Sequence, residues 1–113
     1  MGIDLVNVAD FSKRIGRTKQ LKTRLFTKHE LDSNAKRPIE HLASRFAVKE
    51  AFKKAIGKSE IGWHDVETRN YDSGKPYLQI NKGLLSEFNI IDAEVSISNT
   101  KEYAVAMVIL RKE

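Results

Sequence analysis

The strongest structural signal in this sequence lies in residues 39–57, which read IEHLASRFAVKEAFKKAIG. Apolar side chains recur there every three or four residues, and this spacing predicts an amphipathic helix over residues 39–56. Gly57 ends the pattern, because glycine readily adopts the left-handed conformation that closes many helices. We therefore expect the rest of the fold to pack around this long, buried helix.

One face of the predicted helix carries an unusual charged pair. Glu50 and Lys54 continue a row of side chains at four-residue spacing, and the helical wheel directs both between small and apolar neighbours. An exposed Glu–Lys pair at this spacing has a structural role worth about 0.2–0.5 kcal/mol. In apolar surroundings the same pair is costly to keep, which points to a function. The sequence alone leaves both interpretations open.

The chain before this helix contains shorter signals. Residues 3–8 are apolar and β-branched and predict a strand, and the apolar spacing over residues 11–26 predicts helical turns that break around Gly16. Thr27 and Glu30 fit a capping box, which predicts a short helix that ends before Pro38.

The chain after the helix predicts β-structure. Residues 64–70 and 76–80 flank a turn, residues 94–98 and 103–110 form a second hairpin, and a short helix is expected at 84–88. The strand at 103–110, YAVAMVIL, is apolar on both faces, so either the domain's own helices or another subunit must cover both sides. We predict one α+β domain over residues 1–113, with an antiparallel sheet packed against the long buried helix.

Composition narrows the class of protein. The chain has 113 residues and no cysteine, which excludes a disulfide scaffold, a thiolate zinc site and a cysteine nucleophile. Its apolar runs are far shorter than the roughly 20 residues that a membrane span needs. The first residues lack the basic segment of a signal peptide. We expect a cytoplasmic protein without membrane contact.

The positive charge is concentrated in one half of the chain. The net charge is +5, divided into +8 over residues 1–58 and −3 over residues 59–113. A lysine-rich solvated surface would explain this asymmetry, and so would an acidic partner. Nucleic acid, an acidic protein and a phosphorylated small molecule all remain compatible with the charge.

Two carboxylates could share a metal ion. Asp4 interrupts an apolar strand, where an ionised carboxylate needs a cation or several hydrogen-bond donors unless it caps a strand end. If Asp4 and Glu50 meet, their repulsion favours a divalent cation between them, and Mg²⁺ suits two hard oxygens completed by water and substrate phosphates. The turn Gly74-Lys75-Pro76 either presents backbone amides and a lysine to a phosphate or is simply a turn.

Five segments together resemble a known family. They are GIDLV at 2–6, RFAVKEAFKKAIG at 45–57, GKP at 74–76, VSISNT at 95–100 and YAVA at 103–106. In order and spacing they resemble the holo-acyl-carrier-protein synthases, the small 4′-phosphopantetheinyl transferases. The resemblance covers nearly the whole chain, and its RFAVKEA block is the most specific part.

The resemblance implies a reaction and an assembly. Coenzyme A would donate its phosphopantetheine arm to a serine of an acyl carrier protein, releasing adenosine 3′,5′-bisphosphate, in a homotrimer with active sites between protomers. By the family's pattern, Asp4 and Glu50 bind Mg²⁺, Glu50 takes the serine proton, and Lys54 stabilises the phosphate and assists the leaving group. The residues that resemble the family's coenzyme A contacts are Arg45, Lys54, Gly74, Lys75, Pro76, Asn99 and Thr100.

The sequence departs from the family's pattern at several positions. Many members carry histidine where this chain has Asn99, so a contact near the nucleotide is altered. An arginine that pairs with acidic carrier side chains is commonly found where this chain has Asp10. Only three residues precede Asp4, which predicts a short first strand. Docking of the carrier is therefore expected to shift to nearby basic residues, namely Lys13, Arg14, Arg17 and Arg24.

Two alternative functions remain at this point. The basic half motivates a nucleic-acid-binding module, although the strands lack the aromatic pattern that stacks bases. The departures at Asp10 and Asn99 motivate a catalytically impaired trimer that only binds coenzyme A. Transfer of phosphopantetheine remains the favoured function, with no nucleic-acid partner.

Overall fold

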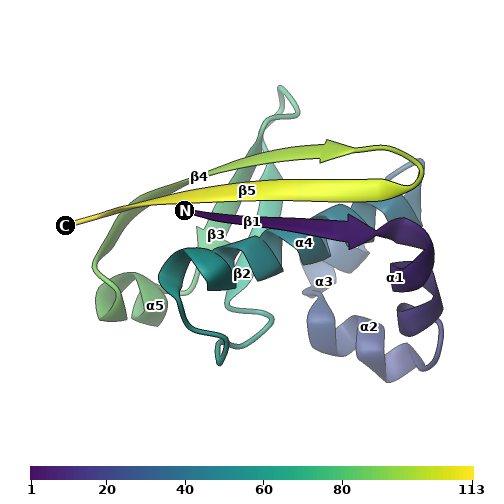
Figure 1. The fold of residues 1–113 in the computed structure, drawn as a ribbon, viewed down its shortest axis with the longest axis horizontal. Coiled ribbons are helices and arrows are strands. Elements are labelled where there is room, and N and C mark those ends of the chain that lie inside the picture. The colour runs from purple at the N-terminus through teal and green to yellow at the C-terminus, as the bar shows by residue number, and fades with distance from the viewer.

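The structure is a computed structural model that describes residues 1–113. Its elements follow the order β1 (Gly2–Asn7), α1 (Val8–Ile15), α2 (Lys19–Leu25), α3 (Lys28–Leu31), α4 (Pro38–Ile56), β2 (Val66–Asn70), β3 (Pro76–Ile80), α5 (Lys82–Glu87), β4 (Ile90–Asn99) and β5 (Tyr103–Lys112). The sheet of β1, β5 and β4 lies across α4, with α1–α3 gathered at one end and α5 at the other (Figure 1). The predicted α+β class, with an antiparallel sheet against a long helix, is confirmed.

The long helix α4 forms where the sequence predicts it. Pro38 occupies its first turn, where a missing backbone N–H costs nothing. Gly57 closes it in the left-handed conformation, with φ of 72°. Residues 42–49 of this helix are all buried, so α4 is surrounded by other elements on every side over two turns.

The three-stranded sheet has the order β1-β5-β4, and both strand pairs are antiparallel. Strand β1 approaches α4 so closely that a Cβ on Gly2 would lie 2.0 Å from the carbonyl oxygen of Ala51. Only glycine fits at this contact. The predicted strand 3–8 is confirmed with shifted ends, because the Asn7 side chain accepts a hydrogen bond from the Asp10 amide and so starts α1 at Val8.

The second half also differs from the prediction at its element ends. Strand β2 begins at residue 66 and not at 64, because Gly62 and Asp65 form a turn joined by a backbone hydrogen bond of 3.0 Å. Helix α5 begins at residue 82, where the Asn81 side chain caps it. Strand β4 extends to residues 90–99, with a change of register between Ile90 and Asp92.

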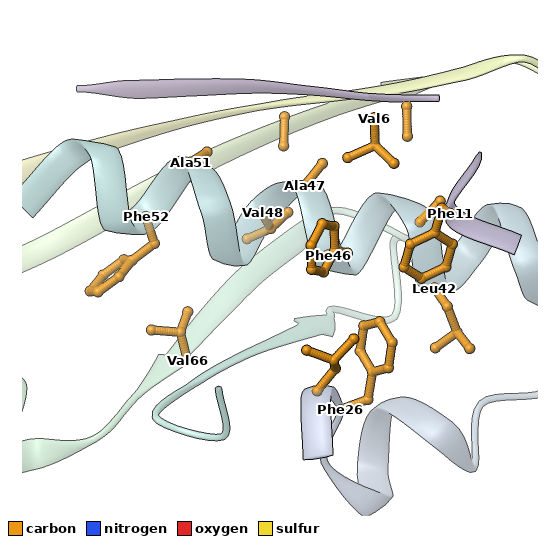
Figure 2. Packing of buried hydrophobic residues seen from close by; sticks show 14 of the residues in the cluster. Val6, Phe11, Phe26, Leu42, Phe46, Ala47, Val48, Ala51, Phe52 and Val66 are labelled. Carbon is orange, nitrogen blue, oxygen red and sulfur yellow. The ribbon is translucent and has the colours of Figure 1, made fainter. Parts of the chain in front are cut away.

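The core lies between the sheet and the helices. Figure 2 shows Val6 of β1 above Ala47 of α4, and Phe46 of α4 beside Phe11 of α1. The ring centroids of Phe11 and Phe46 lie 5.5 Å apart, and the Trp63 ring stacks on Phe46 at 5.6 Å. These aromatic contacts hold α1 and the loop before β2 against α4.

The outer face of the sheet is apolar and uncovered. Strand β5 buries Ala104, Ala106 and Val108 against α4. The side chains that point the other way are 38–64% exposed and comprise Ile3, Leu5, Tyr103, Met107 and Ile109. Of the two predicted covers for strand 103–110, the chain's own helices therefore account for one face only. We call these five residues the outer apolar face.

Candidate functional site

A cavity of about 800 Å³ opens between α4, the β2–β3 turn and β4; we call it the cationic cavity. It brings together Arg45, Gly74, Lys75, Pro76 and Asn99 from three separate parts of the sequence. The other residues that line it are Ala35, Lys36, Arg37, Glu40, His41, Ser44, Asn70, Val95, Ser96 and Ile97. Five of the seven predicted coenzyme A contacts thus line one concave surface.

Two of the predicted contacts lie outside this cavity. The Thr100 hydroxyl accepts hydrogen bonds from the amides of Glu102 and Tyr103, at 3.2 and 3.1 Å, and so holds the β4–β5 turn. Lys54 lies near the far end of α4, beside β1. Lys36 and Arg37 line the cavity but were not selected from the sequence, although they form a basic pair just before the Pro38 that opens α4.

The buried Arg45 and the half-buried His41 set the electrostatics of the cationic cavity. Arg45 is buried on α4 and donates to the Asn70 side chain, while its Nε has no partner within the chain. Burial lowers the pKa of Arg45, and Glu30 opposes that effect. Burial and the neighbouring Arg45 charge lower the pKa of His41 to about 4, so His41 is neutral near pH 7.

A second cavity of about 350 Å³ lies between β1, α1, α2 and α4; we call it the acidic cavity. Asp4 and Glu50 both line it, as the sequence hypothesis of a shared site requires, and Asp10 and Arg14 line it as well. Its remaining residues are mainly apolar and comprise Leu5, Val6, Asn7, Phe11, Leu21, Leu25, Phe46 and Trp63. The two carboxylates therefore stand in a largely apolar recess.

The expected Glu50–Lys54 pair does not form. The Lys54 ammonium lies 3.0 Å from Asp4 Oδ1 and also donates to the Ile3 carbonyl oxygen. Because β1 packs directly on α4, Asp4 is the nearer carboxylate. The Lys54 side chain is exposed, so the idea of a charged pair within an apolar face was wrong for this residue.

A buried ion pair that the sequence did not predict joins α4 to α3. Lys49 lies 2.9 Å from Glu30 Oε1 and also donates to the carbonyl oxygens of Trp63 and Val66. Burial lowers the pKa of Lys49, and the Glu30 carboxylate opposes that effect. The capping box at Thr27 and Glu30 is confirmed, but the capping pattern gave no sign that the same carboxylate holds α4. The pair fixes α4 next to Glu50.

The basic residues predicted to dock a carrier lie on one side of the molecule. Lys13 and Arg14 belong to the last turn of α1, and Arg24 belongs to the last turn of α2. Arg17 lies in the short connection between those helices, and all four side chains are exposed. Arg14 also lines the acidic cavity, with its guanidinium 5.9 Å from the centre of the Phe46 ring.

The donor set fits Mg²⁺ only with help from other ligands. No group of three or more His, Cys, Asp or Glu side chains is placed to hold a metal ion. Asp4 and Glu50 supply hard carboxylate oxygens in one recess. Since Mg²⁺ commonly keeps waters and takes oxygens from substrate phosphates, two carboxylates are a suitable protein contribution.

The family model and the most similar relatives point to the same protein family. A model of the 4′-phosphopantetheinyl transferase superfamily matches residues 1–108. Holo-acyl-carrier-protein synthase of Shouchella clausii is 38% identical, covering 97% of this chain and 95% of its own length. The Bacillus subtilis synthase is also 38% identical, over 99% of this chain and 94% of its own length.

Solved structures agree with the sequence relatives. The Helicobacter pylori holo-acyl-carrier-protein synthase, in complex with coenzyme A, superposes with a TM-score of 0.89 at 28% identity, covering 97% of this chain and 98% of that one. The Bacillus anthracis synthase gives 0.81 at 34% identity, with 99% and 95% covered. No helix of this chain combines the length and apolar character of a membrane span. The chain therefore belongs to the holo-acyl-carrier-protein synthase family of the 4′-phosphopantetheinyl transferase superfamily.

Proposed function

We propose that this chain is a holo-acyl-carrier-protein synthase that moves the 4′-phosphopantetheine arm of coenzyme A to a serine of an apo acyl carrier protein. The observation that carries the proposal is the cationic cavity, which is large enough for a nucleotide and is found in a chain of this family. The whole of residues 1–113 would act as one transferase domain. The setting would be cytoplasmic fatty acid biosynthesis, where coenzyme A and the acidic carriers occur together.

The cationic cavity would hold the nucleotide end of coenzyme A. Lys36, Arg37, Arg45 and Lys75 supply positive charge around it, and Glu40 offsets part of that charge through its ion pair with Arg37 at 3.6 Å. Coenzyme A carries a diphosphate and a 3′-phosphate, so its charge complements this lining. Gly74, Pro76 and Asn99 would contact the neutral parts, with Thr100 holding the adjacent turn.

The acidic cavity would perform the transfer. Asp4 and Glu50 would hold Mg²⁺, which when bound neutralises charge on the phosphate oxygens. Glu50 would accept the proton of the carrier serine as its oxygen bonds to the phosphorus next to the pantetheine. The bond from that phosphorus to the bridging oxygen breaks, and adenosine 3′,5′-bisphosphate leaves with the electron pair. Lys54, 3.0 Å from Asp4, would stabilise the departing phosphate.

A homotrimer would complete the site. The outer apolar face is the kind of surface that buries itself against another protomer. The acidic and cationic cavities are separate in one chain and share no lining residue. An active site between protomers would bring the acidic cavity of one beside the cationic cavity of the next. The exposed cations Lys13, Arg14, Arg17 and Arg24 would then receive the acidic carrier at the mouth of the acidic cavity.

A mass measurement tests donor, acceptor and reaction together. Incubation with coenzyme A, Mg²⁺ and a bacterial apo acyl carrier protein should raise the carrier's mass by one phosphopantetheine. A panel of carriers guards against a wrong acceptor, and chelation of the metal should stop the reaction. If coenzyme A binds but no carrier in the panel gains mass, the chain is a binding protein and the proposal of transfer fails.

A further inference from the structure

We infer that Ser44 fixes the side-chain amide of Asn99 so that its carbonyl oxygen recognises a neutral hydrogen-bond donor of the coenzyme A nucleotide. This inference rests on the proposed function and adds a specificity element to it. Both residues line the cationic cavity, one from α4 and the other from the end of β4.

The two side chains are joined by a directional hydrogen-bond chain. Asn99 Nδ2 donates to Ser44 Oγ at 3.1 Å, and Ser44 Oγ donates to the Glu40 carbonyl oxygen at 3.0 Å. Ser44 is 2% exposed, so its hydroxyl has little access to water as an alternative partner. The segments are 55 residues apart in the sequence, and this contact ties β4 to α4 at the cavity wall.

The direction of this chain decides how the amide is oriented. A serine hydroxyl has a single hydrogen, and here that hydrogen points to the Glu40 carbonyl oxygen. Towards Asn99 the Ser44 oxygen can only accept, so the nitrogen of the amide must face it. The Asn99 carbonyl oxygen is then directed away from Ser44 and has no hydrogen-bond partner within the chain.

An amide oxygen in this position selects against phosphate. It carries partial negative charge and accepts hydrogen bonds, so it repels phosphate oxygens and binds O–H or N–H groups. The cations of the cavity wall have the opposite preference. Coenzyme A offers suitable neutral donors in its ribose hydroxyl and its adenine amino group. Asn99 would therefore fix the position and orientation of the nucleotide in the cavity while the cations hold its phosphates.

Three variants test the inference, namely Asn99→Ala, Ser44→Ala and the double variant. Loss of one net hydrogen bond should weaken coenzyme A binding about 2- to 12-fold in Asn99→Ala. We expect the KM for coenzyme A to rise by the same factor, while kcat and the KM for the carrier stay unchanged. Ser44→Ala should weaken binding in the same direction, and the double variant should be no worse than Asn99→Ala alone. Gln79→Ala, an exposed amide on β3 that lines neither cavity, is the matched control.

Two donor analogues identify the group that Asn99 contacts. The loss of affinity caused by Asn99→Ala, measured as the change in Kd by calorimetry, should be the same for 3′-dephospho-coenzyme A as for coenzyme A. A loss that disappears without the 3′-phosphate would mean that Asn99 binds phosphate, and would overturn the inference. With a 2′-deoxyribose analogue, a vanishing loss assigns the ribose hydroxyl and a persisting loss assigns the adenine amine.

The remaining outcomes separate this inference from the proposed function. If the wild-type chain modifies carriers but Asn99→Ala has unchanged affinity for coenzyme A, only the present inference fails. It fails also if the effects of Ser44→Ala and Asn99→Ala add, because Ser44 would then not act through Asn99. If the wild-type chain neither binds coenzyme A nor modifies a carrier, the proposed function fails first.

Discussion

At the scale of single residues, Glu50 is the side chain on which the proposed chemistry depends most. It lines the acidic cavity with Asp4, and no ion pair within the chain occupies its carboxylate. Glu50→Gln keeps the size of the side chain but removes the proposed base and one of the two proposed metal ligands. We expect turnover to fall by about 10²–10⁴-fold with the fold intact. Phosphopantetheine transfer followed by mass spectrometry measures this, and circular dichroism checks the fold.

The exposed Glu60 provides a control for that substitution, because it lines neither cavity and pairs with no cation. Glu60→Gln should leave turnover unchanged. Normal turnover in Glu50→Gln would remove this residue from the mechanism, whatever the rest of the site does.

His41 gives the cationic cavity a pH-dependent contribution to stability. Its folded pKa of about 4 is below its usual 6.5, so between these values the unfolded chain binds the extra proton. Stability should therefore fall as the pH is lowered through this window. His41→Gln should show a shallower decline, measured by denaturant unfolding at several pH values. Parallel pH curves for the two proteins would contradict the assignment.

At the scale of elements, the contact between β1 and α4 positions the acidic cavity. An alanine Cβ at Gly2 would press against the Ala51 carbonyl oxygen, and neither backbone can move without separating the strand from the helix. We expect Gly2→Ala to lower the free energy of unfolding by about 1–3 kcal/mol. It should lower turnover by a larger factor than it raises Kd for coenzyme A, because Asp4 moves while the cationic cavity does not. Chemical denaturation and transfer assays measure both effects.

Gly16→Ala is the matched control for this contact. Gly16 has an ordinary right-handed backbone with φ of −75°, and the nearest atom to its added Cβ lies 3.2 Å away. Its effect on stability should be small and its turnover normal. Equal losses in the two variants would show that the Gly2 contact has no special role.

The elements were predictable where a local pattern decides them. The helical period and the final Gly57 gave α4 to within one residue, and the capping box placed α3. Ends set by distant or turn contacts were not predictable, such as the start of β2 after the Gly62–Asp65 turn. The hypothesis that Asp4 and Glu50 meet depended on the family resemblance, because periodicity cannot bring residues 46 positions apart together.

Other contacts near the site also join residues that are far apart in the sequence. The Lys49–Glu30 pair and the Ser44–Asn99 hydrogen bond join segments that only the tertiary fold brings into contact. The sequence showed a capping glutamate and a helical lysine, each with an ordinary local explanation. Lys54 illustrates the reverse case, since its spacing from Glu50 suggested a helical pair while the packing of β1 supplied Asp4 instead.

At the scale of the whole molecule, the outer apolar face predicts an assembly. Met107 lies on it with an exposed side chain on the central strand β5. A carboxylate at this position would have to be buried without a partner if protomers meet there, which is strongly unfavourable. Met107→Asp should therefore convert the proposed trimer into monomers in sedimentation experiments and abolish carrier modification, while α4 and the core stay folded.

Ser86→Asp, which adds the same charge on the exposed helix α5, should leave both the assembly and the activity intact. A wild-type chain that sediments as a monomer at micromolar concentrations and is fully active would refute a site shared between protomers. Dissociation with retained activity in Met107→Asp would lead to the same conclusion.

The uneven charge of the molecule predicts how the carrier is recognised. The basic half includes α1 and α2, and the exposed Arg14 lines the acidic cavity together with Asp10, which carries the opposite charge. Arg17 lies between the two helices, and Arg24 lies in the last turn of α2. Replacing Arg17 and Arg24 with glutamate should raise the KM for an acidic carrier at least about 10-fold, with kcat and the KM for coenzyme A unchanged, because exposed charges act mainly on encounter. Salt should raise the wild-type KM for the carrier and have a weaker effect on the variant, because salt screens the same electrostatic attraction that the substitution has already removed.

Asp10→Arg should lower the KM for the same carrier. Measurement of the KM for the carrier at two salt concentrations with each protein tests whether these residues form the docking surface. A KM for the carrier that changes neither with salt nor with charge reversal would mean that the carrier docks elsewhere.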